Sequence, residues 1–205
     1  MGKKTKWERK RKKCSRIVNS TQTRSKYKKT KAKIKKLFKT KKGVKCFQIL
    51  SAMSLSPHFI GCFSQDSLSK LNLCYPCYLM ANIDSSGEKG SHWLALKLDK
   101  DCLEIFDPLG FEIFNWKSVP CQLLEFIHYH STDKKLLIFP RIQSDSSTFC
   151  ALYCCFYILY RNFTSFKRLS RLFSTNLSEN DERLKTLLDV WNWLQNNENT
   201  LSTNE

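Results

Sequence analysis

A histidine and an aspartate are the first residues whose spacing points to chemistry. Residues 91–98 (SHWLALKL) and residues 101–107 (DCLEIFD) both alternate, which is typical of half-buried strands. With a two-residue loop at 99–100, the two segments form a hairpin in which His92 lies directly opposite Asp107, with Cβ atoms about 5 Å apart. A carboxylate beside an imidazole fixes its tautomer and supports its protonated form. The alternative is a half-buried histidine with a structural role only, whose second ring nitrogen forms a hydrogen bond with whichever acceptor is nearby.

Cys150 could supply a nucleophile. It follows the polar residues 144–148 and opens an apolar stretch that contains no helix breaker. This pattern predicts that Cys150 lies in the first turn of a buried helix, with its N-cap among residues 144–148. The positive end of a helix dipole and a nearby imidazolium both stabilise a thiolate. The alternative is a cysteine packed as a small hydrophobe, which is what we expect of Cys154 and Cys155.

Gln143 lies seven residues before Cys150. Its amide N–H could bind a developing oxyanion together with the backbone N–H of Cys150. The alternative is a glutamine at a strand end that satisfies only the local backbone.

The charge distribution divides the chain into two unlike parts. Residues 1–45 hold 21 of the 35 Lys and Arg and one of the 18 Asp and Glu, so their net charge is 21 − 1, or +20. The other residues hold 14 basic and 17 acidic side chains, a net charge of −3. We therefore expect a disordered basic tail at 1–45, one compact domain at 46–195 and a polar C-terminal tail at 196–205.

The basic tail is predicted to bind nucleic acid, because Lys and Arg clusters neutralise phosphates and release counterions. The unbroken run at 9–13 is also typical of a nuclear-import signal. Ile34, Leu37 and Phe38 recur at helical spacing, which indicates partial amphipathic order. A tail that serves only solubility is the alternative. The candidate nucleic-acid-binding residues are Lys10, Arg11, Lys12, Lys13, Lys28, Lys29, Lys35 and Lys36.

Several classes of protein are disfavoured. No apolar stretch reaches the roughly 20 residues of a membrane span, and the N-terminal residues lack the apolar core of a secretory signal. We therefore expect a protein that is not secreted and has reduced thiols. The Cys74–Cys77 spacing lacks a second Cys or His pair, so no metal and no cofactor are expected.

The candidate residues also stand in recognisable motifs. Gly90–Trp93 (GSHW) is followed by residues 104–111 (EIFDPLGF), and then by Gln143 and Cys150, which form a Gln-x6-Cys motif. Residues 56–61 and 183–194 extend the likeness, so it covers about residues 47–195. Together these motifs resemble the adenovirus endopeptidase (adenain) family of cysteine proteases, which is related to the ubiquitin-like-protein proteases.

The resemblance implies an α+β fold with a mixed central β-sheet flanked by helices. It implies that Cys150 is the nucleophile, His92 the general base and then acid, Asp107 the residue that orients His92, and Gln143 the oxyanion donor. Such enzymes cleave viral capsid or core precursors next to small residues such as Gly-Gly during virion maturation, in the virion and the host nucleus.

The family also uses DNA and a capsid-derived peptide as activators. This chain has no cysteine between His130 and Gln143, where the adenovirus enzyme bonds its peptide. We therefore expect that any peptide activator binds without a disulfide, and that the enzyme is a monomer. Two alternatives remain: a protease that removes ubiquitin-like modifiers, and an inactive DNA-binding scaffold.

Overall fold

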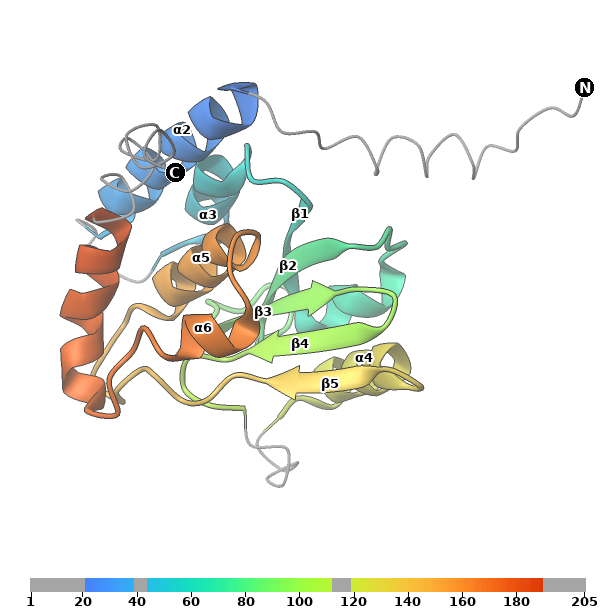
Figure 1. Cartoon of the computed structure of the whole chain (residues 1–205). Coiled ribbons are helices and arrows are strands. Elements are labelled where there is room, and N and C mark those ends of the chain that lie inside the picture. Colours follow the sequence, from blue (N-terminus) through green and yellow to red (C-terminus); the bar gives the residue numbers. More distant parts are fainter. Residues whose placement is uncertain (1–20, 39–43, 112–118, 190–205) are drawn as a thin grey trace, which may run out of the picture.

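A computed structural model describes residues 21–38, 44–111 and 119–189 of the chain. A mixed five-stranded sheet lies at its centre in the order β1-β2-β3-β4-β5, with parallel outer pairs and antiparallel inner pairs. The strands are β1 (Phe59–Ser64), β2 (Cys77–Asn82), β3 (Trp93–Leu98), β4 (Cys102–Phe106) and β5 (Lys135–Ile138). Helices flank both faces, so the expected α+β class with a mixed central sheet is confirmed (Figure 1).

Each face of the sheet has its own hydrophobic core, because alternate strand residues point to opposite faces. Tyr78, Met80 and Ala95 pack with helices on one face. Leu79, Leu94 and Leu96 pack on the other face with the remaining helices. The first group of helices is α2 (Thr21–Leu37), α3 (Cys46–Met53), α5 (Cys150–Arg161), α6 (Phe166–Ser170) and the helical residues 180–189. The second group is η1 (Gln65–Lys70) and α4 (Cys121–Ser131), and a short η3 (Leu177–Glu179) precedes residue 180.

The β3–β4 hairpin has a register different from the predicted one. Leu96 pairs with Ile105 and Leu98 with Leu103, so the two-residue loop is Lys100–Asp101 rather than 99–100. Asp99 explains the difference, because its side chain accepts a hydrogen bond from the N–H of Lys100 and favours the first position of the turn. The predicted direct opposition of His92 and Asp107 is therefore wrong. Because the pairing shifts by an even number of residues, both side chains stay on one face.

The N-terminal region contains more structure than the expected disordered tail. Helix α2 packs on the domain through Ile34 and Leu37, which are 0 % and 8 % exposed and belong to the core that contains α5. Lys33 donates a hydrogen bond to the backbone carbonyl of Ser51 in α3, and Lys35 forms an ion pair with Asp189. The helical spacing of the apolar residues thus predicted the docked face, whereas the boundary at residue 45 cuts through a segment that contributes to the core.

Replacing Ile34 by alanine is expected to destabilise the folded domain by about 2–4 kcal/mol, because the removed methylenes leave a cavity in the core. Thermal and urea unfolding would measure this loss. Lys36→Ala, on the exposed side of the same helix, is the matched control and should leave stability almost unchanged. Equal stability of the two variants would show that α2 does not dock.

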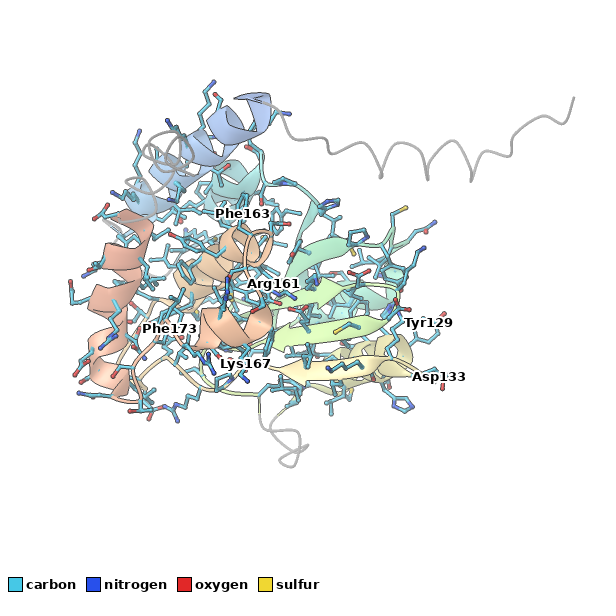
Figure 2. All side chains as sticks on the ribbon, in the orientation of Figure 1. Tyr129, Asp133, Arg161, Phe163, Lys167 and Phe173 are labelled. Atoms are coloured by element: carbon cyan, nitrogen blue, oxygen red, sulfur yellow. The ribbon has the colours of Figure 1, made fainter. Side chains whose placement is uncertain are left out.

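A buried ionic network ties β4 to the C-terminal end of α5. Glu104 is 1 % exposed and accepts two hydrogen bonds from Arg161, both at 2.7 Å. Lys97 and Tyr157 also donate to this carboxylate, each at 2.8 Å. Figure 2 shows Arg161 between α5 and the sheet. Burial raises the pKa of Glu104, but the hydrogen bonds from Arg161, Lys97 and Tyr157 outweigh it, so the net shift is downward.

Within the described residues, no helix is long and apolar enough to cross a membrane.

Candidate active site

His92 directly precedes β3 and Asp107 directly follows β4, so the two residues lie at the same end of these neighbouring antiparallel strands. The Nε2 atom of His92 lies 2.7 Å from Oδ1 of Asp107, and both residues are 9 % exposed. The N–H of Leu109 donates to the same oxygen at 2.9 Å. A carboxylate is an acceptor here, so the proton lies on Nε2 and Nδ1 is the other available ring nitrogen. The pair therefore has the arrangement of an imidazole oriented by a carboxylate.

The second contact of the His92 ring is with Cys150. Burial lowers the pKa of His92, but hydrogen bonds with Asp107 and Cys150 raise it more strongly, to a net value of about 9. The imidazolium is therefore favoured at neutral pH in this environment. A cationic imidazole next to a thiol is the electrostatic setting in which a thiolate forms.

Cys150 begins α5, as the apolar stretch predicted. The predicted side-chain cap among residues 144–148 is wrong: the N-cap is Phe149, which makes no side-chain capping bond. The first N–H groups of a helix have no intrahelical acceptor, so this uncapped end can bind an anion beside the Cys150 sulfur. Ala151, directly after it, is 1 % exposed.

Cys154 and Cys155 are fully buried, as expected of packed thiols. Burial raises the pKa of both, for Cys155 to about 12. Cys150 is the cysteine of α5 whose hydrogen bond raises the pKa of His92, so Cys150 is the candidate nucleophile.

The backbone of Gln143 is bound next to Asp107, and the side chain of Gln143 contacts Ser147. Its N–H donates to the carbonyl of Pro108, one residue after Asp107, at 2.8 Å. Its amide Nε2 donates to the Ser147 carbonyl at 2.8 Å and lies 3.3 Å from Ser147 Oγ. Among the described residues, no hydrogen bond joins Gln143 to Cys150. The Gln143 amide thus donates to local backbone in this structure, and its Oε1 atom is buried without a hydrogen-bond partner among the described residues.

The loop before His92 depends on a glycine. Gly90 has φ +78°, and an added Cβ would lie 2.8 Å from Nδ2 of Asn82, a side chain that is 5 % exposed. Oδ1 of Asn82 is already bound by the N–H of Asp84. The Asn82 side chain therefore has little room to move away from residue 90.

Gly90→Ala is expected to cost about 1–2 kcal/mol for the left-handed backbone, with a further cost for the contact with Asn82. Because the strained loop leads into His92, alkylation of Cys150 should also slow. Gly87→Ala is the matched control, since φ is +96° there but no atom lies within 4 Å of the added Cβ. Comparable stability and alkylation rates in both variants would contradict a specific role for the Gly90 contact.

A small cavity of about 140 Å³ adjoins His92 and Asp107. Its apolar lining includes Leu94, Phe111 and Leu123, which belong to the α4 face of the sheet. Cys150 is not among the lining residues, so this cavity does not extend over its sulfur. A hollow of about 740 Å³ between η1 and α4 contains none of the candidate residues.

The candidate nucleic-acid-binding residues fall into two groups. Lys28, Lys29 and Lys36 are exposed on α2, and Lys35 is half-buried beside Asp189. The basic residues at 10–13 lie outside the described part of the chain. Within the ranges that the structure describes, no group of three His, Cys, Asp or Glu side chains could hold a metal ion.

No protein-family model matches the chain, and no curated protein matches it significantly.

One contact of the loop between Gln143 and Cys150 was not predicted from the sequence motifs: that of Ser147, within this loop, with Asp181. Ser147 accepts the Gln143 amide, and Asp181 accepts the hydroxyl of Ser147 at 2.9 Å. The polar composition of residues 144–148 indicated a turn, but a separation of 34 residues between Ser147 and Asp181 gave no local signal of their contact.

Proposed function

We propose that the chain is a cysteine endopeptidase in which Cys150, His92 and Asp107 form the catalytic triad. The observation that carries the proposal is the imidazole of His92 held between a carboxylate, at 2.7 Å, and a thiol at the start of a helix. A thiol packed only as a hydrophobe has no need of either partner. The resemblance to the adenovirus endopeptidase family supports the same assignment.

In the proposed mechanism, the proton of Cys150 resides on His92 in an imidazolium–thiolate pair, and the thiolate attacks the scissile carbonyl carbon. The tetrahedral oxyanion accepts hydrogen bonds from the backbone N–H of Cys150 and from the Gln143 amide. The imidazolium then donates its proton to the leaving amine as the C–N bond breaks. His92 next deprotonates a water molecule, which attacks the thioester and releases the acid product and the thiol.

We propose substrates with small residues such as Gly-Gly at the cleaved bond, as the resemblance implies. On the same basis, we propose that the substrates are viral capsid or core precursors, which are cleaved in the virion and the host nucleus. The enzyme is proposed to be a monomer. Its proposed activators are DNA and a peptide that binds without a disulfide. The fold proposed for residues 46–195 is that of the adenovirus endopeptidase.

Hydrolysis of Gly-Gly-containing peptides tests the function directly. The wild-type protein should cleave them, and Cys150→Ala should be inactive. Cys154→Ala should retain activity, because the Cys154 thiol is fully buried and donates to the carbonyl of Trp93. Cleavage that survives in Cys150→Ala would refute the assignment of the nucleophile.

Two further measurements separate the alternatives. Faster reaction with a ubiquitin-like modifier that carries a C-terminal electrophile than with a capsid-type peptide would favour a deconjugating protease. Uniform labelling of the cysteines by iodoacetamide, without preference for Cys150 and without dependence on His92, would instead favour an inactive scaffold.

We also propose that the basic N-terminal region binds nucleic acid, because α2 exposes Lys28, Lys29 and Lys36 while its apolar side is docked. Reversing the charge of Lys28 and Lys29 should weaken binding to DNA and reduce the salt dependence of the affinity. Electrophoretic mobility or anisotropy measurements at several salt concentrations test this. An affinity unchanged by the substitutions would place any binding outside α2.

A further inference from the structure

The segment between Gln143 and Cys150 is held at one residue, Ser147. The Ser147 carbonyl accepts the Gln143 amide at 2.8 Å, and its Oγ accepts the N–H of Phe149 at 3.2 Å. Ser147 therefore connects the proposed oxyanion donor with the residue that directly precedes the nucleophile. What fixes Ser147 also fixes the relative positions of these two groups.

Asp181 is the residue that fixes Ser147. Its Oδ1 atom accepts the Ser147 hydroxyl and the Tyr153 hydroxyl, each at 2.9 Å. Tyr153 lies one turn into α5 and is fully buried. Burial raises the pKa of Tyr153, and the hydrogen bond with Asp181 raises it further, so the hydroxyl remains a donor. One carboxylate oxygen thus ties the site loop to the helix that carries Cys150.

The neighbouring residue anchors the start of the same loop. Asn180 is fully buried, and its Nδ2 donates to the carbonyl of Ile142, the residue before Gln143, at 2.8 Å. Two consecutive side chains from a segment more than thirty residues away therefore hold both sides of Gln143.

The chemistry of Asp181 also sets the direction of these bonds. Oδ1 of Asp181 is the acceptor, so the single hydroxyl proton of Ser147 is donated to it. The Ser147 Oγ lone pairs then accept the N–H of Phe149, and Nε2 of Gln143 lies 3.3 Å from the same oxygen. The Ser147 carbonyl holds one N–H of the Gln143 amide, and the other N–H is the one that passes from Ser147 Oγ to the oxyanion. The terminal torsion of a glutamine is soft, and Oε1 of Gln143 has no partner among the described residues. The contacts on Ser147 are thus what orients this amide.

We propose that Asp181 is a positioning residue for the oxyanion hole, acting through Ser147 on Gln143; this rests on the proposed endopeptidase function. Asp181→Ala should lower kcat for peptide hydrolysis about 10- to 100-fold, because a donor displaced by about 1 Å loses this much. KM should change less than about twofold, since the oxyanion exists only in the transition state. Asp181→Asn, whose carbonyl can still accept from Ser147, should recover part of the loss.

Two chemical probes distinguish positioning from general structural support. Iodoacetamide alkylates Cys150 without forming an oxyanion, so its rate should be the same in Asp181→Ala as in the wild type. A peptide aldehyde forms a thiohemiacetal that carries the oxyanion, so its affinity should fall by the same factor as kcat. Glu179→Ala removes an exposed carboxylate from the preceding turn and should change neither measurement.

The decisive comparison places Asp181→Ala in a Gln143→Ala background. If Asp181 acts through Gln143, its substitution causes no further loss of kcat there. An undiminished loss in that background, or an equal fall in iodoacetamide alkylation, would overturn the proposal. A wild-type protein that neither cleaves peptides nor reacts selectively at Cys150 would instead overturn the proposed function itself, and the role of Asp181 with it.

Discussion

Replacing His92 by alanine is expected to reduce kcat/KM for peptide hydrolysis by about 10²- to 10⁴-fold, the contribution of a positioned general base, which is the role proposed for His92. The alkylation rate of Cys150 at neutral pH should fall as well, because the imidazolium that stabilises the thiolate is removed. His128→Ala is the matched control: His128 is exposed on α4 and should affect neither rate. Unchanged alkylation in His92→Ala would contradict an ion pair between His92 and Cys150.

The raised pKa of His92 also predicts how the activity of the wild type depends on pH. Below a pKa of about 9 the imidazolium keeps the proton that the leaving amine needs, and above it that proton is lost. Activity should therefore decline as the pH rises through about 9. Asp107→Asn removes the charge that helps to raise this pKa, so the decline should begin at a lower pH. An alkaline limb at the same pH in both proteins would show that His92 is not the titrating group.

Glu104→Ala is expected to destabilise the fold by about 3–5 kcal/mol, the largest effect on stability that we predict. The substitution leaves the Arg161 guanidinium, the Lys97 ammonium and the Tyr157 hydroxyl without their shared acceptor in a largely buried place. Glu125→Ala, at an exposed position of α4, is the control. Urea unfolding of both variants measures the difference.

The pH dependence of stability provides an independent check on Glu104. Its pKa is lowered in the folded protein, so its stabilising contribution is complete above the unfolded value of 4.5. The contribution is lost as the pH falls below that value and the carboxylate becomes protonated. Wild type and Glu104→Ala should thus converge in stability under acidic conditions. A constant difference down to low pH would contradict an ionic origin.

Much of the candidate site was predictable because its signals are local. Alternation with period 2 depends only on neighbouring residues, and it assigned His92 and Asp107 to one face even though the expected register was wrong. The start of α5 at Cys150 follows from the change from polar to apolar residues. The choice of cap was wrong, because the N-cap is Phe149, the residue directly before the helix, and it makes no side-chain capping bond.

The basic N-terminal region shows why composition alone misleads. Its charge predicts disorder, yet Ile34 and Leu37 pack one face of α2 on the core while Lys28, Lys29 and Lys36 remain exposed. Periodicity detected those apolar residues, but only the packed structure shows that they are buried. Hydrophobic burial acts on one face of a helix and does not require the other face to be apolar.

The candidate catalytic residues, their order, and the strand and helix ends that carry them could be predicted from local sequence patterns. Tertiary structure decided the hairpin register, the docking of α2, the network around Glu104 and the contact of Asp181 with the loop between Gln143 and Cys150. Each of these depends on which distant side chains meet when the layers pack. Such contacts leave no periodicity in the sequence, because the chain between the partners can vary in length and composition without changing the contact.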